Sequence, residues 1–325
     1  MSFRILGTGM YVPPKAVTND DLAQIVETND EWITKRVGVK ERRISENEWT
    51  SEMGAKAAQA ALADAGVKVE ELDMILAASV SGETVSPSMA TMIQHRIGAT
   101  CPAMELNAAC AAFLYLLETA AAFFALHKDY QKILVVGCER MSGILDWTDR
   151  GTCVIFGDGS GAAVLERGEG YLDSVLTVKG GDDVIKIPHF PGTSPFFDRE
   201  QDSPYIHMKG QETFKYAVSA ISSDITALLE RNHLTIDDIA WIVPHQANVR
   251  IIDFASKRLG IDPAKMFVNI EKYGNTSSAS VPIALHELKE SGQLHRGDKI
   301  ILCAFGGGLS NMACLIEYSG RNVPL

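Results

Sequence analysis

The residues with the clearest chemical potential begin with Cys110, in the segment "NAACAAFLYLLETAAAFFAL" at positions 107–126. The cysteine stands at the front of a long apolar run that predicts a helix. A helix N-terminus offers unpaired backbone N–H groups and the positive end of the dipole, which favour a thiolate over a thiol. The position therefore indicates a nucleophile. A small buried hydrophobe is the alternative, and this stretch alone leaves it open.

Three further motifs could complete such a site. His245 ends an apolar run in "VPHQAN", Asn275 lies in "YGNTSSAS", and "FGGGLS" at 305–310 places three glycines after another apolar run. Taken singly, these residues could be a core histidine, a helix cap and a tight turn. Together they offer a nucleophile, an imidazole, a carboxamide and backbone N–H groups able to bind an oxyanion, which points to acyl transfer.

Basic residues form two clusters in an otherwise acidic chain. The segment "TKRVGVKERR" at 34–43 holds five basic residues and follows Trp32, a combination that suits a phosphate-bearing nucleotide ligand such as coenzyme A. A solvated surface turn fits these residues equally well. The second cluster consists of Arg250, Lys257 and Arg258. Together with Lys209 and Lys215, which lie elsewhere in the sequence, it could dock an acidic partner protein.

Several function classes are disfavoured. The net charge of −11 argues against general nucleic-acid binding, which needs clustered Lys and Arg. None of the six cysteines forms a CxxC pair or metal-ligand spacing, so we expect no metal and no disulfide. Phosphate-loop and dinucleotide motifs are missing, and "GDGSGAA" at 157–163 does not satisfy the serine-hydrolase pattern. The N-terminus lacks a secretory signal, so we expect a cytoplasmic protein.

The elements that must position these residues alternate between short apolar runs and helical patterns, which is typical of parallel sheets with crossover helices. We expect strands at 74–80, 132–138, 241–246 and 299–305. The apolar run after Cys110 is long enough to suggest a membrane span. Because Glu118 lies near its middle, a helix buried within the protein fits better, and we expect no membrane association.

An internal repeat organises the chain. The segment 61–78 aligns with 228–245, and "KILVVGC" at 132–138 aligns with "KIILCAF", in both cases 167 residues apart. Two stretches with one spacing indicate a duplication, so we expect two α/β halves, residues 1–170 and 171–325. At this spacing Cys110 falls on Ser277, which predicts that the helix beginning at Cys110 has a counterpart just after Asn275.

These motifs, in this order, resemble those of the β-ketoacyl-[acyl carrier protein] synthase III family of the thiolase-fold superfamily. The resemblance runs from "TNDEWITKRVGVKERRI" through "NAACAAF", "DRGTCVIFGDGSGAAVL", "VPHQANVRII" and "YGNTSSASVP" to "FGGGLS". It implies a five-layered αβαβα sandwich of two duplicated halves and a homodimer. It also implies condensation of a short acyl-CoA, acetyl-CoA above all, with malonyl-acyl carrier protein, without a cofactor, at the start of type II fatty acid synthesis.

The resemblance also assigns site residues. Cys110 is the acyl acceptor, His245 and Asn275 act on the malonyl unit, and Gly307 with Cys110 supplies the oxyanion N–H groups. Phe305 would form an apolar wall that disfavours the malonyl carboxylate. Residues implied to line the coenzyme A tunnel are Trp32, Arg36, Arg150, Met208, Gly210, Phe214, Ala247 and Asn248. Those implied to meet the carrier protein are Lys215, Arg250, Lys257 and Arg258.

Three departures from the family pattern stand out. Ser86 occupies a position where many relatives carry a bulky aromatic that gates the acyl pocket, which predicts acceptance of primers longer or more branched than acetyl. Val37 replaces a frequent Thr. The segment "GGGLSNMA" lacks the Trp usual two residues after the aromatic or Leu of the glycine turn, here Leu309.

Three other functions compete with this interpretation. A degradative thiolase needs a second catalytic cysteine in a glycine motif, which neither Cys303 nor Cys314 provides. A condensing enzyme or acyltransferase of specialised metabolism shares the fold and is the main alternative. A non-catalytic binder of acyl-CoA or carrier protein would carry the same tunnel motifs without turnover.

Overall fold

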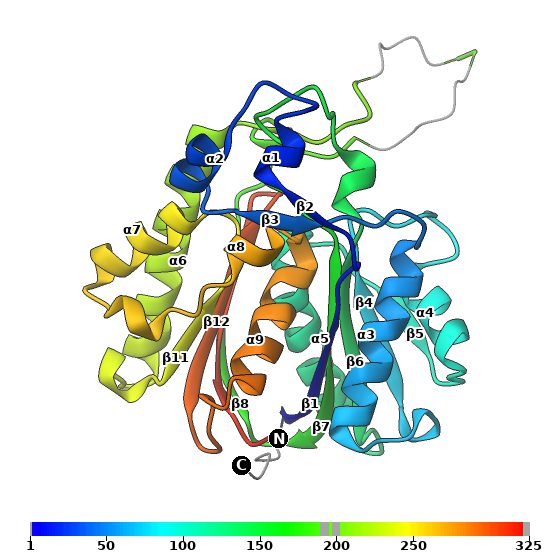
Figure 1. The fold of residues 1–325 in the computed structure, drawn as a ribbon. Coiled ribbons are helices and arrows are strands. Elements are labelled where there is room, and N and C mark those ends of the chain that lie inside the picture. The colour runs from blue at the N-terminus through cyan, green and yellow to red at the C-terminus, as the bar shows by residue number, and fades with distance from the viewer. Residues whose placement is uncertain (1, 189–194, 197–201, 321–325) are drawn as a thin grey trace.

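The computed structural model describes residues 2–188, 195–196 and 202–320. Figure 1 shows two twisted sheets side by side, with helices between them and on both outer faces. Each sheet mixes parallel and antiparallel neighbours. The sequence prediction of an α/β fold with helical layers is confirmed.

The first sheet has the strand order β1-β7-β6-β4-β5. Strands β4 and β6 are parallel and β7 runs antiparallel to both β6 and β1. Its strands are β1 (Ser2–Tyr11), β4 (Met74–Ala78), β5 (Ala103–Glu105), β6 (Lys132–Glu139) and β7 (Gly159–Gly168). The helices of this part of the chain are α1 (Asn19–Leu22), α2 (Asp30–Arg36), α3 (Thr50–Ala65), α4 (Met89–Ile97) and α5 (Ala112–Leu126). A small ladder joins β2 (Ala16–Thr18) to β3 (Glu41–Arg43).

The second sheet has the strand order β11-β12-β13-β8. As in the first sheet, parallel strands, here β11 and β12, are followed by antiparallel neighbours, β13 and β8. Its strands are β8 (Tyr171–Val178), β11 (Trp241–Pro244), β12 (Lys299–Gly306) and β13 (Ser310–Glu317). The helices are α6 (Gly210–Arg231), α7 (Val249–Leu259), α8 (Ile270–Tyr273) and α9 (Ser280–Glu290). A separate ladder pairs β9 (Ile185–Lys186) with β10 (His207–Met208).

Strand alternation explains the layers, because successive side chains of a strand point to opposite faces. In β4, Leu76 faces a central cluster with α5 and α9, whereas Ile75 and Ala77 face a cluster with α3 and α4. In β12, Leu302 faces the same central cluster and Ile301 faces α6 and α7. The result is a five-layered sandwich with α5 and α9 in the middle, as the family resemblance implies.

One helical segment, Ala109–Leu126, is long and apolar enough to span a membrane by length and composition alone. In the fold it lies in the central layer, where Phe113, Leu117 and Phe124 are fully buried between the two sheets. Helix α5 therefore supplies core side chains. The prediction of a helix buried inside the fold agrees with this placement.

Two strand pairs repeat at the predicted spacing, but the central helices do not. The strand pairs β4/β11 and β6/β12 begin 167 residues apart, but α5 and α9 begin 168 residues apart. The turns before these helices are also shifted by 168, since Ala109 and Ser277 both have left-handed backbones, with φ of 48° and 49°. The structural counterpart of Cys110 is therefore Ser278. The prediction of Ser277 was wrong by one residue, because the second half gains a residue between strand and helix.

Candidate active site

Cys110 lies in the 3₁₀ turn η2 (Ala109–Ala111), directly before α5, and is partly buried. The residue before it, Ala109, adopts a left-handed conformation that costs a non-glycine residue about 1–3 kcal/mol. The Asn107 side chain supports this turn, because its Oδ1 accepts a hydrogen bond from Ala109 N at 3.1 Å. The turn sets Cys110 at the head of the central helix.

The glycine turn after β12 contacts this cysteine. A Cβ atom built on Gly306 would lie 2.6 Å from Cys110 N, closer than real side chains approach, so this position requires glycine. The two backbones therefore pass in direct contact. This contact brings the segment of Gly307 against Cys110, as expected for two backbone N–H groups that bind one oxyanion.

His245 follows β11 and is 1% exposed. Its backbone N–H donates to Cys303 O at 2.8 Å. Its imidazole ring packs edge-on against the ring of Phe305, with the two ring centroids 5.5 Å apart. Because Phe305 directly precedes Gly306, the imidazole lies beside the strand end that contacts Cys110. The predicted apolar wall at Phe305 is thus a neighbour of the histidine.

Burial lowers the pKa of His245 to about 3. The imidazole is therefore neutral throughout the neutral pH range, and its buried Nδ1 has no hydrogen-bond partner among the described residues. A neutral imidazole holds one N–H donor and one acceptor nitrogen. It can donate to a substrate oxygen without transferring a full positive charge.

Gln246 is a supporting residue that the sequence analysis did not find. Its N–H donates to Ser280 Oγ, and its side-chain amide donates to Pro244 O and Phe267 O and accepts from Asn269 N. These bonds fix the turn after His245 against the start of α9. Its position next to a candidate histidine was the only signal in the sequence.

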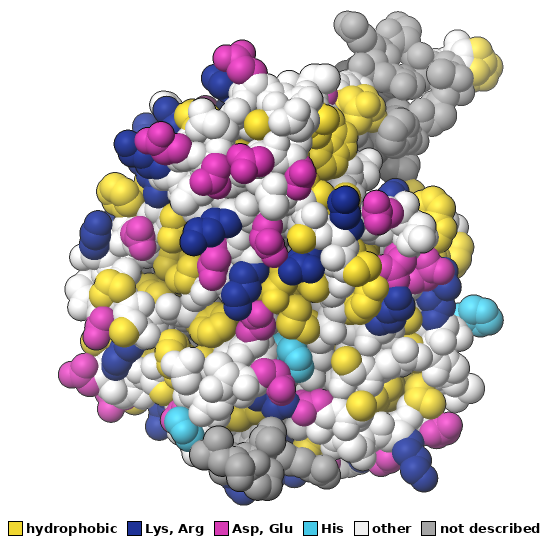
Figure 2. Space-filling view, in the orientation of Figure 1, with side chains coloured by type: hydrophobic (Ala, Val, Ile, Leu, Met, Phe, Trp, Pro, Cys, Tyr) yellow, Lys and Arg dark blue, Asp and Glu magenta, His cyan; other side chains and the backbone are white. Residues whose placement is uncertain are grey.

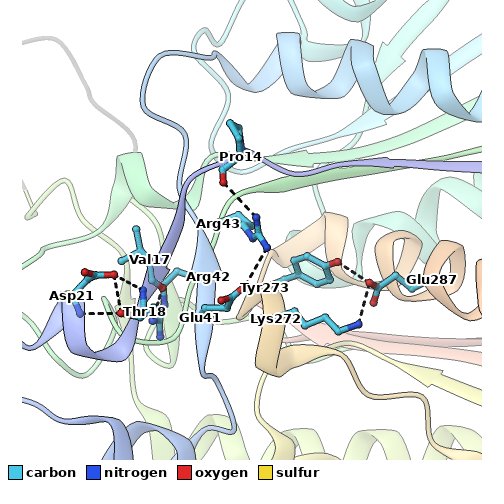
Figure 3. A network of polar contacts seen from close by, with 10 residues as sticks. All are labelled: Pro14, Val17, Thr18, Asp21, Glu41, Arg42, Arg43, Lys272, Tyr273 and Glu287. Carbon is cyan, nitrogen blue, oxygen red and sulfur yellow. Dashed lines mark hydrogen bonds and ion pairs between the residues drawn. The ribbon is translucent and has the colours of Figure 1, made fainter.

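Asn275 is held on three sides. Its N–H donates to Ile155 O at 2.9 Å, and its own carbonyl accepts from Gly157 N at 3.1 Å. The preceding α8 is tied to α9 because Tyr273 Oη donates to Glu287 Oε1 at 2.7 Å (Figure 3). Asn275 Oδ1 accepts from Ser277 N at 2.8 Å, which turns the Nδ2 donor end away from that bond.

Ser277 is a second residue that the sequence analysis missed as a functional candidate. Its buried hydroxyl has no oxygen or nitrogen partner in the part of the chain that the structure describes. It interacts with the Cys110 thiol and favours the thiolate. The internal alignment, which placed Ser277 on Cys110, was the signal that could have drawn attention to it.

The predicted thiolate environment at Cys110 is wrong for the free protein. Burial raises the pKa of this thiol to about 12, and the hydroxyl of Ser277 opposes the shift only in part. A rise of this pKa from 9.0 to about 12 corresponds to about 4 kcal/mol. A helix N-terminus supplies about 0.3–1 kcal/mol, so desolvation outweighs the dipole. Cys110 is therefore a thiol at neutral pH.

This raised pKa predicts the pH dependence of Cys110 alkylation. Only the thiolate reacts with iodoacetamide, so the rate at Cys110 should rise about tenfold per pH unit from pH 6 to 10 without a plateau. Ser277→Ala should slow the reaction about tenfold at each pH, because a hydrogen bond to a charged group contributes about 1.5–3 kcal/mol. Peptide mass mapping separates Cys110 from the half-buried Cys101. A plateau near pH 8 would contradict the raised pKa.

The position in the second half that corresponds to Cys110 is surrounded by polar partners. Ser278, the counterpart of Cys110, donates its hydroxyl proton to Glu139 Oε1 at 2.7 Å, and its Oγ also lies 3.2 Å from Ala78 O. Glu139 stands where the second half has Gly306, and Ala78 stands where it has His245. The carboxylate is fully buried and also accepts from Val80 N at 3.0 Å. The Ser278 side of the repeat is therefore occupied by polar partners, whereas Cys110 stays partly exposed.

The residues implied for coenzyme A meet around Trp32 on α2. The guanidinium groups of Arg36 and Arg150 lie 5.0 and 5.2 Å from the centre of its indole ring. Asn248 Nδ2 donates to Arg36 O, which joins α2 to the start of α7. A cavity of about 690 Å³ is lined by Trp32, Lys35, Arg36, Arg250 and two neighbours. Aromatic and cationic groups therefore gather as the resemblance implies.

The other residues implied to line the tunnel lie on α6, directly before α7 and in the β9–β10 ladder. Arg250 lies over the ring of Phe214 at 5.6 Å, which links α7 to α6. Met208 pairs with Ile185 between β10 and β9, and Ile185 lies 3.5 Å from a Cβ built on Gly307. Gly210 begins α6 two residues after Met208, with Lys209 between them as the N-cap. Ala247 N donates to His245 O at 3.0 Å.

The four basic residues implied for the carrier protein are exposed. Lys215 lies on α6, and the other three lie along α7; they are Arg250, Lys257 and Arg258. Figure 2 shows Lys and Arg side chains over the region of α2 and α7, mixed with acidic groups. The structure thus presents cations on the same side as the Trp32 cavity.

Two sequence expectations need qualification. Of the basic segment 34–43, only its first part lines the cavity; Arg42 is fully buried and donates to Val154 O, and Arg43 pairs with Glu41 at 3.1 Å (Figure 3). Arg42 and Arg43 therefore stabilise the fold and do not line the cavity.

Ser86 is exposed in the loop between β4 and α4, and no contact in the structure joins it to Cys110.

Within the described ranges, no group of three or more His, Cys, Asp or Glu side chains gathers as a metal site would require. The six cysteines are all free thiols. The chemistry near Cys110 that the described residues offer is therefore that of a thiol, a neutral imidazole, a carboxamide and backbone N–H groups.

Comparison with known proteins places these features in a family. Residues 104–183 match the family model "3-Oxoacyl-[acyl-carrier-protein (ACP)] synthase III", and residues 229–318 match the model of its C-terminal part. The chain is 48% identical to beta-ketoacyl-[acyl-carrier-protein] synthase III of Clostridium acetobutylicum over 98% of its length and 99% of the relative. It is 44% identical to the protein of that name from Clostridium beijerinckii, with the same coverage.

Comparison of the fold with solved structures finds proteins of the same name. The crystal structure of 3-oxoacyl-[acyl-carrier-protein] synthase III from Aquifex aeolicus superposes with a TM-score of 0.91 at 41% identity. The match covers 97% of this chain and all of that one.

Proposed function

The chain belongs to the β-ketoacyl-[acyl-carrier-protein] synthase III family, and from this premise we propose how its residues divide the reaction. It is an acyltransferase that condenses an acyl-CoA primer with malonyl-acyl carrier protein and initiates fatty acid synthesis. We propose that residues 1–170 supply the nucleophile and residues 171–325 supply the donors that act on the malonyl group. This proposal rests on the contacts that Cys110 makes with Gly306 and with the Ser277 hydroxyl, both of which come from the second half.

In the first half-reaction, Cys110 Sγ attacks the carbonyl carbon of the acyl-CoA thioester. A tetrahedral oxyanion forms, and the N–H groups of Cys110 and Gly307 bind it. The C–S bond to coenzyme A then breaks, and the proton that Cys110 loses is balanced by the one that the coenzyme A sulfur gains. One thioester replaces another, so the step is close to balanced in free energy.

In the second half-reaction, malonyl-acyl carrier protein occupies the same tunnel. Its carboxylate leaves as CO2, and the electron pair of the broken C–C bond moves into an enolate. His245 and Asn275 Nδ2 donate to the enolate oxygen. Because the pKa of His245 is lowered to about 3, it donates as a neutral group and leaves the carbon nucleophilic. The carbon attacks the acyl-Cys110 carbonyl, the tetrahedral oxyanion collapses, and Cys110 leaves as a thiolate that takes up one proton from solvent.

We infer further that this enzyme needs no cofactor and acts in the cytoplasm as a homodimer. The reaction as written balances with protein groups, the two thioester substrates and one proton from solvent. The exposed cations Lys215, Arg250, Lys257 and Arg258 suit an acidic carrier protein, since opposite charges speed encounter. Arg36 and Arg150, whose guanidinium groups both lie over the Trp32 ring, suit the phosphates of coenzyme A, and the indole suits its adenine.

The function is tested together with the primer prediction. Acetyl-, isobutyryl- and octanoyl-CoA are each mixed with the protein and malonyl-acyl carrier protein, and the 3-oxoacyl products are identified by mass. We expect CO2 and product from all three primers, at rates within about tenfold, because Ser86 offers no bulky gate. Absence of any condensation would refute the proposed roles, whereas turnover of acetyl-CoA alone would refute only the role of Ser86.

A matched pair of variants isolates that position. Under the gating role that the resemblance implies, Ser86→Phe should reduce the octanoyl-to-acetyl rate ratio at least about tenfold. An unchanged ratio would show that this exposed residue, which has no contact with Cys110, gates nothing. Val85→Ala, at the exposed neighbouring residue, should leave the ratio unchanged.

A further inference from the structure

The position where the family pattern has Trp is filled here by Asn311, two residues after Leu309. Asn311 is the second residue of β13, lies opposite Phe305 of β12 and is 3% exposed. Its side chain lies on the same face of the strand as Ala313 and Leu315, which face α6. A buried amide at the root of the glycine turn requires partners.

Two residues of α6 supply those partners. Asn311 Nδ2 donates to Asp224 Oδ2 at 2.6 Å, and Tyr216 Oη donates to Asn311 Oδ1 at 2.5 Å. Tyr216 Oη also lies 3.3 Å from Leu309 O, the carbonyl at the end of the glycine turn. The Tyr216 hydroxyl has one proton and two possible acceptors, Asn311 Oδ1 and Leu309 O. Which of them accepts the proton depends on the orientation of the Asn311 amide.

The same turn carries other bonds. Leu309 O accepts from Lys179 N at 2.8 Å, and Ser310 Oγ donates within reach of both Gly307 O, at 2.9 Å, and Ala108 O, at 3.3 Å. Movement of Leu309 O would therefore also move Ser310 and the glycine turn, in which Gly306 contacts Cys110 and Gly307 lies beside Ala109. A displacement of about 1 Å in a catalytic group can cost about 100-fold in rate.

We propose that Asp224 is a positioning residue that acts through Asn311 and Tyr216 on the glycine turn, and that its protonation reverses the direction of the hydrogen bonds along this chain. This inference rests on the proposed oxyanion role of Gly307. With Asp224 ionised, Asn311 donates to it and Tyr216 donates to Asn311, as the distances show. The charge-assisted bond holds the amide firmly in this orientation.

When Asp224 takes a proton from solvent, its new O–H donates to Asn311 Oδ1 and the amide turns over. Asn311 Nδ2 then donates to Tyr216 Oη, and the tyrosine O–H turns to donate to Leu309 O. The contact of 3.3 Å shortens and draws the turn toward α6, away from Cys110. Acyl transfer is therefore slower in the protonated form.

The surroundings of Asp224 allow this titration near neutrality. Burial raises the pKa of Asp224 to about 6, and the bond from Asn311 opposes the shift. The titratable groups whose pKa responds to its charge are Tyr115 on α5, Tyr216 on α6 and Cys303 on β12. None of these three carries a positive charge that would fix Asp224 in its ionised form.

The test compares kcat and KM of wild type and Asp224→Asn for acetyl-CoA condensation from pH 5 to 8. The introduced amide would be neutral and could donate to Asn311, so this variant imitates the protonated state. We expect a wild-type-to-variant kcat ratio near one at pH 5 that rises to about three- to tenfold at pH 8, with a midpoint near pH 6 and KM within twofold. Taking the ratio cancels the pH dependence of Cys110 itself.

Two controls make the outcome specific. Tyr216→Phe removes the hydroxyl that transmits the change, so adding Asp224→Asn to it should have no further effect on kcat. Glu230→Gln changes an exposed acid on the same helix and should give a ratio of one at every pH. A ratio independent of pH, or a full Asp224→Asn effect in the Tyr216→Phe background, would overturn the inference. A wild type inactive at every pH would instead refute the proposed function.

Discussion

Replacing Cys110 by Ala should abolish acyl loading. After incubation with acetyl-CoA, the intact mass of wild type should increase by one acetyl group and that of Cys110→Ala should not. Steady-state condensation should fall at least about 10⁴-fold, because removal of a covalent nucleophile leaves only binding and oxyanion contacts. Coupled measurement of free coenzyme A gives the rate of loading.

The design separates catalysis from folding. Cys101→Ala changes a half-buried thiol on another part of the surface and should load as wild type does. Cys110→Ala should keep the ability to decarboxylate malonyl-acyl carrier protein slowly, because His245 and Asn275 are intact. An acyl adduct on Cys110→Ala would show that another group accepts the acyl chain.

Much of the architecture was predictable from the sequence, because strands such as 74–78 and 132–139 are apolar on both faces and helices flank them. The duplication also followed from strand spacing. Its register at the nucleophile did not, since a single extra residue before Ser277 changes which residues correspond. The left-handed backbones of Ala109 and Ser277 are each supported by a local hydrogen bond, to Asn107 Oδ1 and to Asn275 Oδ1 respectively.

The motifs identified the candidate nucleophile and donors, but not their electrostatics. Helix polarity suggested a thiolate at Cys110, whereas the depth of burial, which depends on both sheets, makes it a thiol. The same burial keeps His245 neutral. The network of Asp224, Asn311 and Tyr216 could not be predicted either, because its members come from α6 and β13, about 90 residues apart in sequence.

Replacing His245 or Asn275 by Ala should have the opposite effect to Cys110→Ala: acyl loading persists and condensation fails. Each side chain is proposed to donate to the enolate oxygen, and loss of one such donor costs about 10²–10³ in rate. The effects of the double variant should be less than additive, because both donors serve one oxygen. Loading is followed by intact mass, and decarboxylation by release of CO2 from malonyl-acyl carrier protein.

The pH dependence of decarboxylation adds an independent check on His245. Lowering its pKa from 6.5 to about 3 means that the fold disfavours the protonated imidazole, so acidification from pH 8 to 5 should leave the group neutral. Measured in Cys110→Ala, where the acyl transfer that depends on Gly307 is absent, the decarboxylation rate should therefore show no step near pH 6.5. A loss of rate through pH 6.5 would mean that the histidine titrates normally. Normal condensation by Asn275→Ala would show that the enolate needs no carboxamide donor, and the paired-donor account would fail.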